Sequence, residues 1–158
     1  MRRGRRPAPW ILAGARLGLA TALGLALADP TVAVAAPDFV VIVHPSVTGK
    51  TIRRSDLAAV YLRKATRWGA GVTAVPVDQS GTSAVRKAFS EAVLGMSVAT
   101  VVQYWQSQAF ATKPLRPPLV KNSDAEIVAF VARNEGAVGY VSSAAALTPE
   151  VKAISLTD

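Results

Sequence analysis

The stretch VTAVPVDQSGT, from Val72 to Thr82, passes from an extended apolar run into a turn of small polar residues. The run from Val72 to Val77 predicts a strand. A helix is expected from Thr82 to Leu94 because apolar residues recur there at steps of three and four, and Gly95 follows at a position that glycine favours. The expected apolar stripe is Ala84, Val85, Ala88, Phe89, Ala92 and Val93, with Arg86, Lys87, Ser90 and Glu91 on the solvated face.

The turn Asp78-Gln79-Ser80-Gly81-Thr82 has the composition of an anion-binding helix start. The first amides of a helix lack partners within the helix, and the helix dipole favours negative charge there. The hydroxyls of Ser80 and Thr82 and the amide of Ser83 would add donors, while Gly81 lets a ligand approach the backbone closely. The same residues also suit a plain helix start, since Ser and Thr are preferred N-caps. The turn by itself leaves both interpretations open.

Strands alternate with helices along the rest of the chain, which predicts an α/β layered domain. Further strands are expected at Phe39 to Val43, at Ala137 to Val141 and at Val151 to Leu156. The segment between the first of these strands and the first helix is expected to be a loop containing Gly49. The prolines from Pro114 to Pro118 predict an extended loop.

Three other helices are expected to start at residues with N-terminal chemistry: Ser55-Asp56, Ser97 and the capping-box pattern from Ser123 to Glu126. In the second of these helices Trp105 falls on the apolar stripe, which favours a core role over a ligand platform. The expected buried residues are Leu57, Val60, Tyr61 and Leu62, then Val98, Val101, Val102, Trp105 and Ala109, then Ile127, Val128, Phe130 and Val131.

Residues 1–36 predict a secretory signal peptide. This segment has the three parts of a signal peptide: a basic start, an apolar run from Trp10 to Ala28, and small residues before the mature chain. Cleavage is expected after Ala36, with Ala35 as the alternative, which leaves a single domain of residues 37–158. An uncleaved membrane anchor is the second interpretation, because the apolar run reaches spanning length, although Arg16 interrupts it. Sec and twin-arginine export both stay open.

Composition narrows the classes of function. The chain has no cysteine, which excludes a lipidated anchor cysteine, disulfides and thiolate metal sites, so a periplasmic or secreted protein is expected. Removing the signal peptide removes five arginines and one aspartate, leaving 13 basic and 9 acidic residues and a net charge of +4. This excess suits a small anion but lacks the dense basic stripe of a nucleic-acid binder.

Candidate catalytic groups are few. The single histidine, His44, follows the first strand, and Ser80 lacks the Gly-x-Ser-x-Gly setting of a nucleophile elbow. The carboxylates stand at helix starts or on polar faces and form no metal-ligand cluster. No enzyme activity, metal or cofactor is expected.

Six short motifs follow one another in the chain. They are Pro45-Ser46, Ser55-Asp56-Leu57, Tyr61-Leu62-Arg63-Lys64, Arg67-Trp68, the turn from Asp78 to Thr82, and Gly136-Ala137-Val138-Gly139-Tyr140-Val141. In these motifs the chain resembles the periplasmic phosphate-binding proteins, the class II substrate-binding components of ABC transporters. The resemblance runs from about Phe39 to Ser143. It implies one stand-alone lobe of that fold, with a central mixed sheet flanked by helices.

The resemblance implies that the turn holds phosphate or a related oxyanion through Ser80, Gly81 and Thr82, with the Ser83 amide as a further donor. It places Asp78 beside the turn, where that carboxylate orients the loop or accepts a hydrogen bond from a protonated ligand. Ser80, Gly81 and Thr82 occupy the matching positions of the family's motif.

The chain departs from the family at Pro76, because the family's phosphate-binding arginine stands four residues before the serine of the turn. A domain of this size also has no room for a second lobe. A helix N-terminus contributes at most about 2 kcal/mol to holding an exposed anion. Each lost charge-assisted hydrogen bond removes roughly 1.5 to 3 kcal/mol. Weak binding is therefore expected; Arg86 or Lys87 could partly replace the arginine, although solvated surface charge is the favoured interpretation for both.

Two hypotheses remain. The first is a non-enzymatic binding protein of a phosphate uptake system, which completes its site by homodimerisation or by docking to a partner such as an ABC-transporter permease. The second is an interaction or sensory module of the cell envelope that kept the lobe fold and lost ligand binding.

Overall fold

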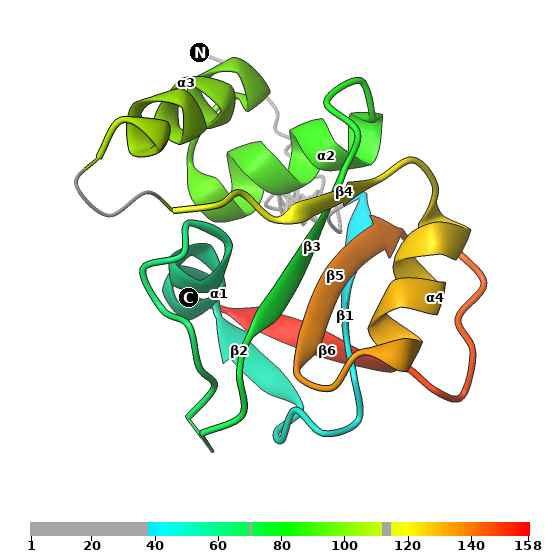
Figure 1. The fold of residues 1–158 in the computed structure, drawn as a ribbon. Helices are drawn as coiled ribbons and strands as arrows, with labels where there is room; N and C mark the ends of the chain where they lie inside the picture. The colour runs from blue at the N-terminus through cyan, green and yellow to red at the C-terminus, as the bar shows by residue number, and fades with distance from the viewer. Residues whose placement is uncertain (1–37, 70, 112–114) are drawn as a thin grey trace, which may run out of the picture. The chain divides into compact units, whose positions relative to one another are not determined.

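The computed structural model describes residues 38–69, 71–111 and 115–158, and the expected signal peptide and its cleavage site lie outside the described residues. Within them, six strands form one mixed sheet in the order β2-β6-β1-β5-β3-β4 (Figure 1). β1 is antiparallel to both β5 and β6, whereas β3 is parallel to β5 and β4, and β2 is parallel to β6. The strands are β1 (Phe39–Val43), β2 (Thr51–Arg53), β3 (Val75–Gln79), β4 (Leu119–Lys121), β5 (Ala137–Ser142) and β6 (Lys152–Thr157).

Helices cover both faces of the sheet, as the α/β prediction requires. Helices α1 and α2 pack on one face, against Val41 and Val43 of β1, while α4 packs on the other face against Ile42. Alternate residues of β1 therefore enter two separate cores, which is why its apolar run is unbroken. The helices are α1 (Arg54–Tyr61), α2 (Ala84–Phe89), η1 (Ser90–Leu94), α3 (Val98–Ala109) and α4 (Asp124–Arg133).

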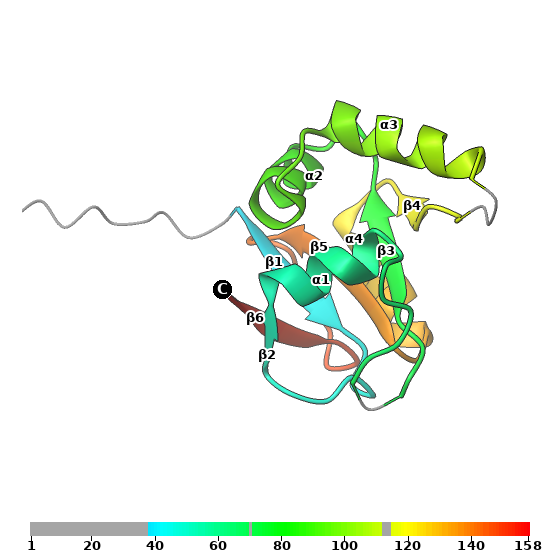
Figure 2. The ribbon, with the colours of Figure 1, turned by 90° about the vertical axis from the view of Figure 1, so that its left-hand side faces the viewer.

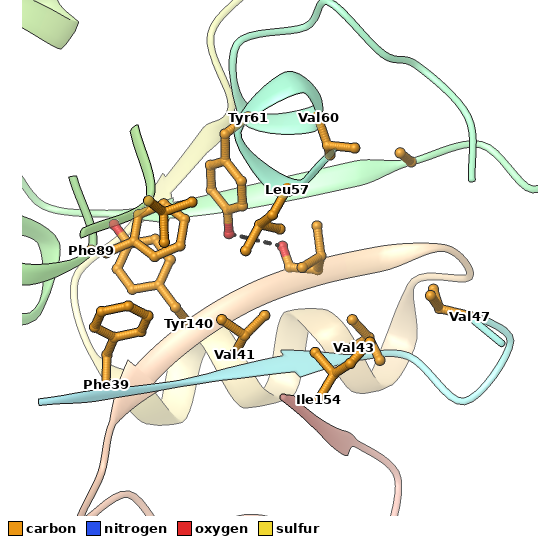
Figure 3. Packing of buried hydrophobic residues seen from close by; sticks show 13 residues of the cluster. Phe39, Val41, Val43, Val47, Leu57, Val60, Tyr61, Phe89, Tyr140 and Ile154 are labelled. Atoms are coloured by element: carbon orange, nitrogen blue, oxygen red, sulfur yellow. Dashed lines mark hydrogen bonds between the residues drawn. The ribbon is translucent and has the colours of Figure 1, made fainter. Parts of the chain in front are cut away.

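Four aromatic rings fill the core beneath α1 and α2 (Figure 3). Phe89 stacks on Tyr140 with ring centroids 3.9 Å apart, and Phe39 meets the edge of Phe89 at 5.5 Å. Tyr61 is tilted against Phe89 at 4.7 Å, and its hydroxyl donates to the carbonyl oxygen of Val77 at 2.9 Å. The one polar atom that α1 brings into this core is thus satisfied.

The β3 strand differs from the predicted one. It begins at Val75 rather than Val72, because Thr73 pairs with Arg67 in a short bridge, and it continues through Asp78 and Gln79, which were expected in the turn. Pro76 is tolerated in this inner strand. The Val75 amide donates to the Gly136 carbonyl, so the backbone of the next residue, Pro76, faces the other neighbour, β4. The pairing of β3 with β4 begins only at Val77, so the amide hydrogen that proline lacks is not needed there.

The short strands β2 and β4 were not predicted. Each has three residues at an edge of the sheet, too few to show an alternating pattern, and the sequence instead suggested loops there. The strands at Phe39, Ala137 and Val151 were predicted correctly to within one residue at each end.

The helix expected from Thr82 begins two residues later, at Ala84, with Ser83 as its N-cap. From Ser90 it continues as the π-helical turn η1, where the Ser90 carbonyl accepts from Gly95 and from Met96, and it ends at Gly95 with a left-handed φ of 64° as predicted. The polar-face assignment is wrong for two residues, since Arg86 and Ser90 are buried.

The other helices follow the prediction in part. α1 starts at Arg54 with Arg53 at the N-cap and no side-chain cap, rather than at Ser55, but Leu57, Val60, Tyr61 and Leu62 are buried as expected. Ser97 and Ser123 cap α3 and α4 through their hydroxyls.

The expected apolar stripe of α3 is largely uncovered. Only Val101 is buried, Trp105 is half-buried and Val102 and Ala109 are exposed, because α3 packs chiefly on the short turn η1 and not on the sheet (Figure 2). In α4, Ile127, Val128 and Val131 are buried as predicted, and Phe130 is half-buried. Among residues 38–69, 71–111 and 115–158, no helix has the length and apolarity needed to cross a membrane.

Candidate anion-binding turn

Four residues, Ser80 to Ser83, join the end of β3 to the start of α2, and we call them the anion turn. The Ser80 amide donates to the Lys121 carbonyl of β4 at 3.0 Å, which fixes the first residue to the sheet. The Ser80 carbonyl accepts from the Ser83 amide at 3.0 Å, which closes the turn. The Ser80 and Thr82 hydroxyls lie 3.1 Å apart. The structure thus brings together the hydroxyls that the sequence singled out.

The donors left to a ligand differ from those expected. The Ser83 amide is used inside the turn, and the Ser83 hydroxyl caps α2 by accepting from the Arg86 amide at 3.3 Å. In the described part of the chain, the amides of Gly81, Thr82 and Ala84 make no hydrogen bond. The Ser83 amide, which was expected to bind a ligand, is thus already used inside the turn, and its role as a ligand donor stays a prediction. The Ala84 amide, which the sequence did not single out, is a further available donor.

A shallow cavity of about 340 Å³ opens at this turn. Gly81, Thr82 and Ser83 line one side, and Ser97 and Val98 at the start of α3 line the other. Two helix N-termini therefore border the same cavity, which sums two positive dipole ends at one place.

Two charged side chains of opposite sign also line this cavity, Lys87 on α2 and Glu91 on η1. Both are exposed, as their expected polar-face positions imply. Lys87 supplies positive charge and Glu91 offsets it, so the charge balance of the cavity depends on how each is placed when an anion is present.

Asp78 does not line the cavity but lies beneath the turn, 6% exposed. It forms a buried ion pair with Arg86 of α2, accepts a hydrogen bond from the Tyr140 hydroxyl, and accepts another from the Gln79 amide at 2.9 Å. Arg86 donates a further hydrogen bond to the Gln79 carbonyl at 2.8 Å. The pair thus ties α2 to the last two residues of β3, directly before the turn.

Burial is the main cause of the shifted pKa values of Asp78 and Tyr140 in this cluster. Desolvation raises the pKa of Asp78, and the opposing effects of Arg86, Tyr140 and the Gln79 amide only partly counter it. The pKa of Tyr140 is also raised, first by burial and then by the adjacent Asp78 carboxylate. Tyr140 therefore remains a neutral hydrogen-bond donor.

Gln79 is the central polar residue that sequence reasoning missed. Its side-chain nitrogen donates to Asp124 of α4 at 2.8 Å and to the Tyr140 carbonyl at 3.1 Å. Its side-chain oxygen accepts from the Ser83 hydroxyl at 2.7 Å. Asp124 in turn accepts from the Ser142 hydroxyl at 2.6 Å. This network connects the turn to α4 and β5, and no local spacing rule links its five positions.

His44 makes a local hydrogen bond to the Ser46 hydroxyl at 2.8 Å, as expected of a loop histidine. Within the described residues, no group of three carboxylate or histidine side chains is placed to hold a metal ion.

Comparison with solved structures shows the same fold in phosphate-transport proteins. An ABC-type phosphate transport receptor from Vibrio cholerae matches with a TM-score of 0.57 and 21% identity over 75% of this chain and 46% of that one. PstS from Borrelia burgdorferi matches with a TM-score of 0.57 and 11% identity over 77% of this chain and 47% of that one.

A third structure, with bound phosphate, is of a Clostridium perfringens protein assigned as a phosphate ABC transporter substrate-binding protein. It matches with a TM-score of 0.56 and 22% identity over 75% of this chain and 44% of that one. The chain thus spans less than half the length of these proteins, consistent with the expected single lobe. No family model and no curated protein matches the sequence.

Proposed function

We propose that this chain is an exported, non-enzymatic binding protein whose anion turn holds phosphate or a related oxyanion weakly. The observation that carries the proposal is the set of donors at the anion turn. Gly81, Thr82 and Ala84, whose amides make no hydrogen bond within the described residues, line one cavity, and the Ser80 hydroxyl lies 3.1 Å from the Thr82 hydroxyl beside it. Tetrahedral oxyanions suit such a set, because each oxygen can accept from an amide or a hydroxyl.

The fold comparison supports the ligand class. One structure with this fold contains phosphate and another is described as a phosphate transport receptor. In such a role the chain would deliver its ligand to the permease of an ABC transporter from the periplasm or the outer surface of the cell, after removal of the segment 1–36.

Weak affinity follows from the charges. Arg86 cannot act as an unpaired countercharge, because Asp78 neutralises it beneath the turn, and Glu91 opposes Lys87 at the rim of the cavity. The dipole contribution of a helix end is only about 0.3 to 1 kcal/mol where the site is exposed. A second copy of the chain or a docked partner would therefore complete the site.

Isothermal titration calorimetry of the purified protein with inorganic phosphate at low salt tests this proposal, with sulfate as a competing anion. The double variant Ser80→Ala, Thr82→Ala should lose the binding heat. The matched control Thr66→Ala, Ser155→Ala removes two hydroxyls from exposed positions that do not line this cavity and should keep it. The absence of saturable heat up to millimolar phosphate in the folded wild type would leave the turn as a helix cap.

The uncovered face of α3 favours a second candidate function, an interaction or sensory module of the envelope. Val102 of α3 is 47% exposed and Phe110, the C-cap residue directly after α3, is 92% exposed, although both are large apolar side chains. Exposed apolar groups of this size on a helix whose stripe is uncovered are typical of a docking surface.

Sedimentation velocity distinguishes self-association from docking to another protein. If a second copy covers α3, Val102→Ser with Phe110→Ser should abolish a concentration-dependent dimer, whereas Leu147→Ser, an exposed apolar residue outside this helix, should not. A wild type that stays monomeric at all concentrations would exclude the homodimer.

A further inference from the structure

A second and larger cavity, of about 590 Å³, shares no residue with the anion turn. Residues of α1, β2, β6, the loop after β1 and the segment 65–69 line it. Trp68 of this segment and Val75, the first residue of β3, both donate to the Gly136 carbonyl, whereas the anion turn follows the last residue of β3, so the two cavities adjoin opposite ends of the strand. A volume in this range is typical of small-molecule sites.

The floor of this cavity is apolar. Val47, Val60 and Ile154 come from the β1–β2 loop, α1 and β6, and all three belong to the core cluster shown in Figure 3. Trp68 adds an indole to the wall. Its ring nitrogen donates to the Gly136 carbonyl at 2.8 Å and its backbone amide to Val72 at 2.8 Å, so the wall is held in place.

The rim carries charge that is not internally balanced. Arg53 is paired with Asp56 at 2.9 Å. Among the described residues, the exposed guanidinium of Arg67 has one hydrogen bond, a long one to the Gly71 carbonyl at 3.4 Å, and no carboxylate lies within 4.0 Å of it. Two arginines and one aspartate leave a net positive rim above an apolar floor.

Three of these residues, Asp56, Arg67 and Trp68, belong to the motifs that the sequence analysis singled out but that the anion turn does not use. The hydrogen bond of Trp68 accounts for a structural role of that residue in holding the cavity wall. It gives no structural role to the neighbouring Arg67, whose guanidinium makes no strong contact with the protein.

We propose that this cavity binds a small amphipathic carboxylate. The apolar body of the ligand lies on Val47 and Val60 and against the Trp68 ring, and its carboxylate pairs with Arg67. The guanidinium can donate two parallel hydrogen bonds to a carboxylate, which fixes the orientation of the ligand. The site is independent of phosphate binding at the anion turn.

Phenylacetate is a suitable probe, and 2-phenylacetamide is its uncharged counterpart. In ¹H–¹⁵N NMR titrations of the purified protein, phenylacetate should shift amides of residues 47–53 and 65–69 in a saturable manner, with those of 80–84 unaffected. A dissociation constant on the order of 1 mM is expected for a ligand of about ten non-hydrogen atoms. The amide should bind at least about fivefold more weakly, because it cannot form the ion pair.

Two variants and one control separate the site from the fold. Arg67→Gln should raise the dissociation constant about five- to tenfold, and Ala59→Leu, which fills the cavity from α1, should abolish binding. Arg133→Gln, an exposed arginine of α4 outside the cavity, should change nothing. Thermal melting shows whether each variant is folded.

Three results would overturn the proposal. They are no saturable shift up to about 10 mM phenylacetate, well above the expected dissociation constant, equal binding of the amide and the acid, or shifts confined to 80–84. Unchanged affinity in folded Arg67→Gln would also overturn the assigned role of that arginine.

Discussion

Arg86 of α2 and Asp78 of β3 form an ion pair in which each residue is only 6% exposed. The pair spans the anion turn, since one partner precedes it in the chain and the other follows it. Tyr140 and Gln79 complete the hydrogen bonding of the carboxylate. The ion pair thus supports the turn from beneath, and neither of its residues lines the cavity.

The ion pair should be coupled strongly. Removing Arg86 leaves the Asp78 carboxylate buried without compensation, so Arg86→Met should lower the free energy of unfolding by about 3 to 5 kcal/mol at neutral pH. Asp78→Asn should cost less there, because burial already disfavours the ionised carboxyl. The double variant should lose clearly less than the sum, as measured by urea denaturation. For comparison, Arg53→Gln, in an exposed pair with Asp56, should cost no more than about 1 kcal/mol. Additive losses at 78 and 86 would show that the pair is not coupled.

The stability conferred by Asp78 should depend on pH in an unusual direction. Burial raises the pKa of this carboxyl in the folded protein, so the native state binds the proton more tightly than the unfolded state does. The contribution is therefore fully present below the unfolded pKa of about 3.9 and is lost as the pH rises through the raised folded pKa. The difference in unfolding free energy between wild type and Asp78→Asn should fall over that window. A difference that increases with pH would mean that Arg86 dominates over desolvation.

Charge at the cavity of the anion turn should tune phosphate affinity in both directions. Glu91→Gln removes a repulsive charge and should strengthen binding about two- to fivefold, while Lys87→Gln should weaken it by a similar factor. Both effects should shrink at high salt, because exposed charges are screened. Calorimetric titrations at two ionic strengths test this, and equal affinities in both variants would place the anion elsewhere.

Gly136 should tolerate no side chain. Its φ is 71°, and a Cβ atom there would lie 2.0 Å from the Thr73 carbonyl oxygen. Gly136→Ala should therefore destabilise the fold by more than about 2 kcal/mol, because backbone must move. Gly95→Ala is the matched control, with a φ of 64° and open space at its Cβ, and should cost about 1 kcal/mol. Similar melting temperatures for the two variants would contradict the close contact at Gly136.

The predictability of this fold depended on apolar periodicity. β1 and β5 are inner strands with unbroken apolar runs, and α4 has both a cap and a stripe, so their sequences predicted them. The apolar stripe of α3 led to a prediction of burial, but the sheet does not cover this stripe. Periodicity shows that a helix has an apolar face and does not show what packs on that face.

For the candidate site, the sequence located the turn but not its support. Ser80 and Thr82 could be named as candidates because Ser-Gly-Thr at a helix start has the chemistry of an anion site. Arg86 was placed on the solvated face because it is charged, although the helix buries it against Asp78. Pairing between a strand end and the following helix depends on their packing angle, which no residue spacing encodes.

The π-helical turn of η1 has a consequence for variation in chain length. A π-turn contains one more residue than the α-helical turn it replaces, and is equivalent to a one-residue insertion within a helix. Deletion of a single residue between Ser90 and Leu94 can be absorbed by a return to α-helical winding, which leaves the sheet register and the start of α2 unchanged. Sequences one residue shorter at this point can therefore retain the same turn after β3.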